Sequence, residues 1–480
     1  MEREFNLADR ARRALQEAGF QPDFPAKAAS EARAAERSKL PPVMDLSHLL
    51  WSSIDNEESR DLDQLEYAEP GPEGSIRLLL AIADVASFVP PDSAIDQRAR
   101  HNTVSLYTAG GTFHLLPPDL STGKTSLLQN ETRLALVADM LVEDDGEVHQ
   151  PKVYQAKVKN KARLTYDAVG GWLESARPLP EFDETPGLKE QLTMQWEASQ
   201  RLELLRKKMG SLVFTSYEAR AVIRNGRCVD MAICERSRAR DLIESLMVAT
   251  NVATATFLKS RGFPIIERAV HAPKRWDRIC QIAAGYGVKL PETPAPKPLA
   301  DFLAARRVTN PDDFKNLSLT VLKLLGSGEY VVEPPDQQLS GHFGLAVDDY
   351  SHSTAPNRRY ADLVIQRLLS ASLEKNGPPY SNTELQEIAQ RCTEREDAAR
   401  KVERFMRKVA AAQFLSEQIG RTFAGIVTGA SSKGTFVRLF RPAVEGKVER
   451  GEHGLDVGDR VQVRLISTDP ERGFIDFERA

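Results

Sequence analysis

Residues 52–67 read SSIDNEESRDLDQLEY, which places Asp55, Asp61 and Asp63 within nine residues. Asp61 and Asp63 flank Leu62, so in an extended segment both carboxylates point to one side while Leu62 points towards the core. Carboxylates this close repel one another unless a cation lies between them. Oxygen ligands of this kind suit Mg²⁺ or Mn²⁺, and such a site supports metal-assisted phosphoryl transfer.

The acidic stretch has two alternatives to a catalytic metal site. An EF-hand loop is excluded, because Arg60 occupies the sixth position, where that loop requires glycine. A solvated acidic loop without any ligand stays open on these residues alone, since acidic clusters are frequent on protein surfaces.

Around this stretch, strand and helix patterns alternate. Residues 65–67, a turn rich in Pro and Gly, and the apolar run 76–89 predict a hairpin. Helical periodicity predicts helices at 192–209 and 239–258, and a long helix or helix pair at 383–418. A Pro-rich loop, 291–298, separates parts of this region.

The two ends of the chain differ from the middle. Residues 6–18 and 25–38 predict two short helices, for which a packing role is a better expectation than DNA binding. The last sixty or so residues alternate in short strands broken by Gly and Asp, which is typical of a small five-stranded barrel.

The net charge of −4 over 480 residues argues against a protein that simply coats nucleic acid. An acidic metal site inside a basic channel remains compatible with it, because local charge then matters more than the total. Basic residues do cluster, although solvated helix faces would account for the clusters as well. They are Arg236, Arg238 and Arg240, and then Arg400, Lys401, Arg404, Arg407 and Lys408.

Composition also bounds the cellular setting. The sequence has no run of about 18 apolar residues, and its first residues lack the apolar core of a secretory signal. The four cysteines are scattered without a CxxC pair, which argues against a disulfide framework and against a zinc site. We therefore expect a soluble cytoplasmic protein.

Several stretches resemble the ribonuclease II family, in the family's order and over roughly residues 46–375. They are IDNEESRDLDQ (54–64), LLLAIADVASFVPPDSAIDQRARHNTVSLY (78–107), LLPPDLSTGKTSLLQNETRLAL (115–136) and GHFGLAVDDYSHSTAPNRRYADLVIQRLL (341–369). The resemblance implies an α+β fold with a mixed RNB-type catalytic domain. It also implies an exoribonuclease that needs one or two Mg²⁺ ions, or Mn²⁺.

The implied domain order is as follows: a short helical N-terminal domain at 1–45, the catalytic domain at 46–375, a helical extension at 376–418 and an OB-fold domain at 419–480. The family usually has two cold-shock-type barrels where this chain has the helical segment. The OB-fold domain resembles the ribosomal S-one type. No lysine-rich tail follows Ala480, which favours the ribonuclease II branch over the ribonuclease R branch.

One position in the signature departs from the family. Gln64 stands where the family has a fourth aspartate, so the implied metal ligands are Asp55, Asp61, Asp63 and the neutral amide of Gln64. By resemblance, Asp61 and Asp63 also serve in catalysis, and Asp63 is the least dispensable. Because Gln64 carries no negative charge, we expect the affinity of the site for one metal ion to depend on this substitution.

Arg358 and Arg359 follow Pro356 and precede an apolar helical run, and Ser353 and Thr354 are placed to cap that helix. Two arginines at a helix N-terminus are unfavourable when they bind nothing, because they oppose the helix dipole. Together with the free backbone N–H groups there, they can instead form a phosphate-binding site. Surface arginines placed by chance are the alternative. In the family, Arg358 matches the catalytic arginine, and Arg359 would hold a neighbouring phosphate.

Three more residues match RNA contacts of the family. Tyr107 and Phe214 stand where an aromatic clamp stacks on bases, although lone aromatics are more often core residues. Glu244 matches a contact to the terminal ribose, and Asn251 shares its helix face seven residues later. The alternative for Glu244 is a surface ion pair with Arg240.

In the C-terminal barrel, Phe436 matches an aromatic residue of the RNA-binding face. Lys433 stands where that module usually has another aromatic, so charge would matter more than stacking there. Phe423 fits either the core or the surface.

The sequence thus predicts a monomeric 3′→5′ exoribonuclease that processively degrades single-stranded RNA to nucleoside 5′-monophosphates without sequence specificity. Polarity and product are implied by the resemblance alone. One alternative is an RNA-binding protein of the same fold whose catalysis is weak or lost because of Gln64. Another is a structural or regulatory partner whose N-terminal helices bind DNA or protein.

Overall fold

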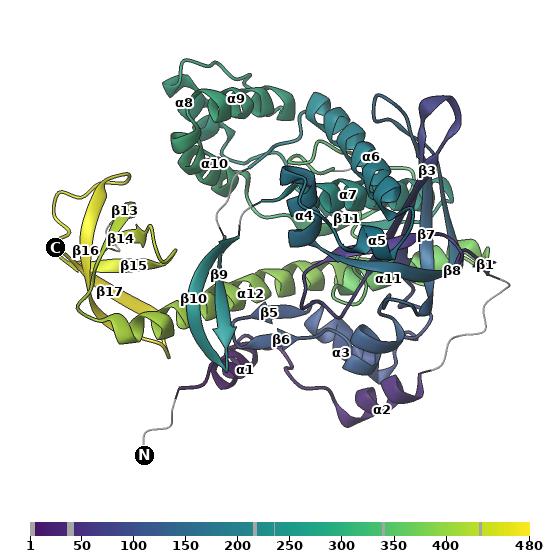
Figure 1. Cartoon of the computed structure of the whole chain (residues 1–480), viewed down its shortest axis with the longest axis horizontal. Helices are drawn as coiled ribbons and strands as arrows, with labels where there is room; N and C mark the ends of the chain where they lie inside the picture. Colours follow the sequence, from purple (N-terminus) through teal and green to yellow (C-terminus); the bar gives the residue numbers. More distant parts are fainter. Residues whose placement is uncertain (1–4, 36–42, 215–217, 235, 338–340, 432–433) are drawn as a thin grey trace.

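A computed structural model of the chain describes residues 5–35, 43–214, 218–234, 236–337, 341–431 and 434–480. Figure 1 shows a larger body of sheet and helices and a small barrel, with the long helix α12 (Asn382–Leu415) running between them. This architecture confirms the predicted α+β class with a C-terminal all-β barrel.

A six-stranded sheet forms the centre of the larger body. In pairing order its strands are β1 (Met44–Asp45), β8 (Val148–Thr165), β2 (Trp51–Asp55), β3 (Gln64–Pro70), β4 (Ile76–Ala83) and β7 (Thr132–Val142). The β3–β4 hairpin is antiparallel, as predicted. The long β8 pairs first with β7 and then with β2, so it borders both ends of the β2–β3–β4–β7 run.

Helices cover both faces of this sheet, which explains why β4 is apolar along most of its length. Neighbouring residues of a strand face opposite sides. Leu79 lies in one core with residues of α11 (Tyr360–Leu373). Leu80 lies in another core with residues of α6 (Leu188–Met209) and α7 (Arg238–Ser260), which confirm the helices predicted at 192–209 and 239–258.

The remaining elements of the larger body surround the sheet. The helices are α3 (Ala94–Asn102), α4 (Tyr166–Ser175), α5 (Glu181–Glu184), α8 (Trp276–Gly285), α9 (Pro296–Thr309) and α10 (Pro311–Leu325), with single turns at Pro72–Gly74, Leu120–Lys124 and Ser416–Gln418. The paired strands are β5 (Leu106–Thr108) with β6 (Gly111–Phe113), β9 (Glu218–Arg224) with β10 (Arg227–Cys234), and β11 (Ile265–Ala269) with β12 (Glu329–Glu333). The predicted loop 291–298 was too long, because proline fits the first helical turn and α9 begins at Pro296.

The predicted N-terminal helices are α1 (Leu7–Glu17) and α2 (Ala26–Ala34); the predicted end of the second one lies outside the described residues. Leu15 of α1 is buried in a core that also contains residues of α12 and of the barrel. The guanidinium of Arg395 lies 3.7 Å from the ring centroid of Phe20, just after α1. These contacts support the packing role expected for the segment.

The barrel at the end of the chain is closed, with five strands in the order β13-β14-β15-β17-β16, as predicted. They are β13 (Thr422–Ser431), β14 (Gly434–Leu439), β15 (Glu445–Arg450), β16 (Arg460–Asp469) and β17 (Phe474–Arg479). The predicted helix or helix pair before it is the single helix α12, which Ser381 and Glu384 cap reciprocally.

Within the described ranges, no helix has an apolar stretch long enough to cross a membrane. The thiols of Cys228, Cys280 and Cys392 are free.

A substitution in the turn between β5 and β6 tests whether α1 packs against this turn. A Cβ on Gly110 would lie 2.4 Å from the carbonyl oxygen of Leu7 and 2.6 Å from Cβ of Ala11. We expect Gly110→Ala to lower the free energy of unfolding by about 1–3 kcal/mol, because α1 must move. Urea unfolding measures this. Gly285→Ala is the control, since its Cβ would meet nothing within 4 Å; equal effects of the two variants would contradict the prediction.

Candidate active site

The connection between β2 and β3 brings the aspartates of the signature together. The two strands are antiparallel neighbours, with Ser52 opposite Glu66. Asp55 therefore ends one strand close to where the next strand begins after Asp63. Leu62 is buried, as predicted, and its N–H donates to Ser126 Oγ at 3.0 Å, which ties the loop to the body.

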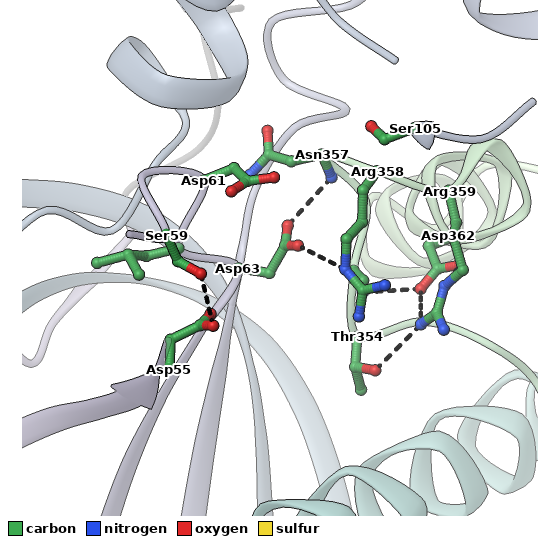
Figure 2. A network of polar contacts seen from close by, with 12 residues as sticks. Asp55, Ser59, Asp61, Asp63, Ser105, Thr354, Asn357, Arg358, Arg359 and Asp362 are labelled. Carbon is green, nitrogen blue, oxygen red and sulfur yellow. Dashed lines mark hydrogen bonds and ion pairs between the residues drawn. The ribbon is translucent and has the colours of Figure 1, made fainter. Parts of the chain in front are cut away.

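Asp63 is the most deeply buried of the three aspartates, with 3% of its surface exposed. Its carboxylate accepts a hydrogen bond from the backbone N–H of Asn357 at 3.1 Å and lies 3.6 Å from Nε of Arg358. Burial raises the pKa of Asp63 to about 7, although Arg358 opposes this shift. Figure 2 shows the Arg358 guanidinium directed at this carboxylate.

Asp55 and Asp61 are half-buried on either side of Asp63 (Figure 2). Asp55 accepts hydrogen bonds from Ser59 Oγ at 2.8 Å and from the N–H of the next residue at 2.7 Å, and burial raises its pKa. Asp61 accepts a hydrogen bond from the hydroxyl of Tyr107 at 3.1 Å. Removal of the hydroxyl from water raises the pKa of Tyr107, although 46% of the residue is exposed, so this hydroxyl stays protonated and can donate.

Gln64 is the first residue of β3 and is half-buried. Two residues later Glu66 is fully buried, and neither of its carboxylate oxygens has a hydrogen-bond partner among the described residues. Burial, and then the charge of Asp55, raise the pKa of Glu66 well above its ordinary value. Sequence reasoning missed Glu66. The signal that could have found it was an acid between Leu65 and Tyr67, in the first strand of the predicted hairpin.

The two predicted arginines differ in their surroundings. The Arg358 side chain is 44% exposed and reaches Asp63, whereas the Arg359 guanidinium is held by both oxygens of Asp362 at 2.8 and 2.7 Å. Arg359 is thus paired within the protein in this structure.

The predicted capping of the following helix was wrong. Helix α11 begins at Tyr360, and its N-cap is Arg359 without a side-chain cap, so Ser353 and Thr354 do not fill that position. Asp362 in the first turn instead accepts a hydrogen bond from the backbone N–H of Ala355 at 2.7 Å. An acid inside the helix, favoured by the helix dipole, therefore holds the preceding turn.

A cavity of about 1250 Å³ opens beside the aspartate loop. It brings together Asp61, Tyr107, Phe214 and Glu244, four of the residues that the sequence singled out. Among the residues that the structure describes, its charged lining comprises six arginines and five acids: Arg60, Arg220, Arg236, Arg240, Arg307 and Arg407, and Glu58, Asp61, Asp241, Glu244 and Glu403. Part of each predicted basic cluster therefore faces a shared space.

The two predicted clamp aromatics both line this cavity. Tyr107, in β5, is 46% exposed, while Phe214 is half-buried and packs partly against the core of α8, α9 and α10. An exposed ring beside an acidic loop is free to stack on a ligand, so the geometry favours Tyr107 over Phe214 as a stacking surface.

Glu244 does not form the alternative pair with Arg240. It lies 3.4 Å from Arg236, while Arg240 donates to Asn56 Oδ1 at 3.0 Å. Asn251, on the same helix, is buried and accepts hydrogen bonds from the backbone N–H and hydroxyl of Ser353 at 2.8 and 2.9 Å. It therefore positions the segment that leads to Arg358.

The barrel residues lie elsewhere. Phe436 is half-buried on β14, at a position that alternates with core residues, and Phe423 is buried in the core. Lys433 lies outside the described residues. Phe436 does not line the cavity that contains Tyr107.

The family implies a divalent metal ion. In the described ranges, no three His, Cys, Asp or Glu side chains converge closely enough to form a metal centre. The oxygens of Asp55, Asp61 and Asp63 accept hydrogen bonds from protein groups instead. The donor set is nevertheless all oxygen, as Mg²⁺ prefers, and the unpartnered Glu66 carboxylate carries a burial cost that a cation would offset. The donor chemistry therefore fits a hard divalent cation.

Solved structures of low sequence identity share this fold. Mycoplasma genitalium RNase R in complex with ribose-methylated single-stranded RNA matches with a TM-score of 0.87 and 23% identity, covering 99% of this chain and 78% of that chain. Yeast Ssd1, described as a pseudonuclease, matches with a TM-score of 0.71 and 15% identity, covering 95% of this chain and 57% of that chain. At such identities the likeness shows the fold alone.

Curated relatives extend the likeness to sequence. Ribonuclease R of Escherichia coli strain K12 is 29% identical over 472 residues, covering 90% of this chain and 57% of the relative. Ribonuclease R of Thermotoga maritima is 28% identical over 494 residues, covering 95% of this chain and 68% of the relative. The chain therefore spans little more than half of the E. coli relative. These names do not support the predicted ribonuclease II branch.

Family profiles match both parts of the chain. The C-terminal S1 domain of RNase II-type exonucleases matches residues 421–480, which contain the barrel. The RNB domain matches residues 43–375, well over half of the chain and including the aspartate loop, the cavity-lining Tyr107 and Arg358. The chain belongs to the RNB-domain family.

Proposed function

We propose that the protein is a 3′→5′ exoribonuclease that hydrolyses single-stranded RNA, processively and without sequence specificity, to nucleoside 5′-monophosphates. The observation that carries this proposal is the buried Asp63 carboxylate facing Arg358, beside a cavity lined by Asp61 and an exposed tyrosine. The names of the curated relatives support RNA as the substrate.

Each residue has a role that its surroundings support. Asp55, Asp61, Asp63 and the amide of Gln64 would hold Mg²⁺ or Mn²⁺, which supplies an activated water and steadies the leaving oxygen. Arg358 is half-exposed and would stabilise the charge that develops on the phosphate under attack.

Binding would depend on the cavity. Tyr107 would stack on a base near the 3′ end. Phe214, which lines the same cavity from a distant part of the sequence, would complete the aromatic contact with the bases. Glu244 would accept a hydrogen bond from the terminal ribose, which distinguishes RNA from DNA through the 2′-hydroxyl. Arg359 would contact a neighbouring phosphate only after exchanging its bonds to Asp362.

The barrel would hold RNA outside the cavity through Phe436, with Lys433 adding charge. The closed five-stranded fold and the half-buried position of Phe436 support this role.

A second candidate is an RNA-binding protein with little or no turnover. Gln64 supports it, because the loop then offers one charge fewer to a cation. The likeness to Ssd1 shows that this fold also occurs in a protein described as a pseudonuclease. The third alternative, a structural partner that acts through the N-terminal helices, is less favoured because Leu15 of α1 is buried against the body.

The central prediction concerns RNA cleavage. With Mg²⁺ and 5′-labelled oligoadenylate, the wild-type protein should give a ladder that shortens from the 3′ end. Asp63→Asn should abolish it, and Arg358→Ala should lower kcat by about 100- to 1000-fold, because charge on the phosphate is no longer stabilised. Asp45→Asn, at an exposed acid on β1, is the matched control and should leave the ladder unchanged.

The alternative gives a different pattern in the same gel. If wild-type protein binds the oligonucleotide but leaves it intact, and Gln64→Asp alone introduces cleavage, the RNA-binding protein is correct. Absence of RNA binding at low salt would contradict both.

Asp63 also makes stability depend on pH. Its folded pKa of about 7 exceeds its ordinary value of 3.8, so the folded state loses stability as pH rises between these values. In EDTA, Asp63→Asn should therefore gain stability over wild type across this window, by on the order of a few kcal/mol, and level off above it. Urea unfolding at a series of pH values measures this.

The control for this pH series is Asp45→Asn. Hydrogen bonds from Ser47 lower the pKa of Asp45, so this variant should show no gain as pH rises. A gain for Asp63→Asn that is independent of pH would contradict the prediction.

Two variants of Tyr107 distinguish base stacking by its ring from the hydrogen bond that its hydroxyl donates to Asp61. Tyr107→Ala should weaken binding of single-stranded RNA by about 1–3 kcal/mol, because a base loses its stacking partner. Tyr107→Phe removes only the hydroxyl and should bind RNA like the wild type. Fluorescence anisotropy at fixed salt measures both; equal losses in the two variants would show that the ring does not stack.

A further inference from the structure

Glu66 lies in an unusual setting for an acid. On β3 it alternates with Leu65 and Tyr67, and its side chain is fully buried on the face of the sheet covered by α6. Gln195 of α6 donates to the backbone carbonyl of Glu66 at 3.3 Å and to Ser52 Oγ at 3.4 Å. In the described part of the chain, both carboxylate oxygens of Glu66 lack a hydrogen-bond partner. Such burial is unfavourable unless a cation or a proton neutralises the group.

The Glu66 side chain lies next to the aspartate loop. Because side chains alternate along a strand, Glu66 faces the same side of β3 as Gln64. After burial, the charge of Asp55 raises the pKa of Glu66. Burial, and then the charges of both acids, raise the pKa of Tyr166 at the start of α4. Tyr166 itself packs against the core on this face of the sheet.

Arg240 lies beside Tyr166 and also lines the cavity. The guanidinium of Arg240 lies 4.4 Å from the ring centroid of Tyr166 and donates to Asn56, the neighbour of Asp55. Among the described residues, the Glu66 carboxylate accepts no hydrogen bond from Arg240. The buried Glu66 carboxylate thus keeps unpartnered oxygens among the described residues, while Arg240 contacts Tyr166 and Asn56.

A divalent cation in this region needs anionic ligands, and Gln64 offers only a neutral amide. We propose that Glu66 is a ligand of the divalent cation in this protein and supplies the negative charge that Gln64 lacks. This inference rests on the proposed metal-dependent function of the same site. It adds a ligand outside the signature, on the strand that follows the loop.

The competing possibility is a neutral Glu66 that is bonded to the Gln195 amide. The Oε1 atom of Gln195 is likewise buried and unpartnered in the described residues, so this bond is not formed in the structure. The two cases differ in what an isosteric amide does. Glu66→Gln preserves a neutral hydrogen-bonding group but removes an anionic ligand.

Titration calorimetry of the full chain with Mn²⁺, without RNA, tests the proposal. Glu66→Gln should weaken Mn²⁺ binding by about tenfold or more, and Gln64→Asp in that background should restore it. Glu267→Gln is the matched control: Glu267 is also a fully buried acid, but it lies on β11. Wild-type affinity in Glu66→Gln would overturn the proposal.

Two further measurements keep the test decisive. Thermal unfolding in EDTA shows whether Glu66→Gln is folded. If it is not, anomalous diffraction from wild-type crystals soaked in Mn²⁺ decides, since an ion bound to Asp55 without Glu66 overturns the proposal. Cleavage of oligoadenylate is scored separately: Mn²⁺ binding that depends on Glu66 without RNA hydrolysis would refute the proposed function and leave this inference standing.

Discussion

The contact between Asp63 and the turn before α11 is the constraint on which the site depends. The backbone N–H of Asn357 and the guanidinium of Arg358 both meet the Asp63 carboxylate, across 294 residues of sequence. Asp362 holds the turn in place through Arg359. Such partners offset part of the cost of removing this carboxylate from water. Any shift of the turn would separate the buried acid from its arginine.

The buried acids of this site lower the stability of the fold. Asp63 and Glu66 occupy buried positions on or beside β3, where aliphatic side chains would stabilise the sheet. The cost is local, because apolar cores on both faces of the sheet hold the strands in register around it. Polar groups that destabilise a core but are retained there point to function rather than packing. That reasoning applies to Glu66 as much as to Asp63.

The sequence predicted what depends on local pattern: the β3–β4 hairpin, helices α6 and α7, and the five-stranded barrel. The spacing around Leu62 also predicted that Leu62 points into the core, which the structure confirms. Partnerships between distant segments could not be predicted, because no local signal links Asp63 to a backbone N–H near residue 357. The start of α11 was misjudged since Ser353 resembles a cap, whereas Asp362, within the helix, holds the turn.

Moving a charge from position 64 to position 66 keeps it on one face of β3 but displaces it by about 6.6 Å along the strand. Glu66 is one methylene longer than the aspartate that the family has at position 64, and this recovers only part of that distance. A cation held by Glu66 would therefore lie deeper in the sheet, nearer Asp55 than Asp61. Asp61, which is hydrogen-bonded to Tyr107 at the cavity wall, would then be the metal ligand nearest the RNA end. The neutral Gln64 thus implies a redistribution of roles among the acids rather than the loss of one.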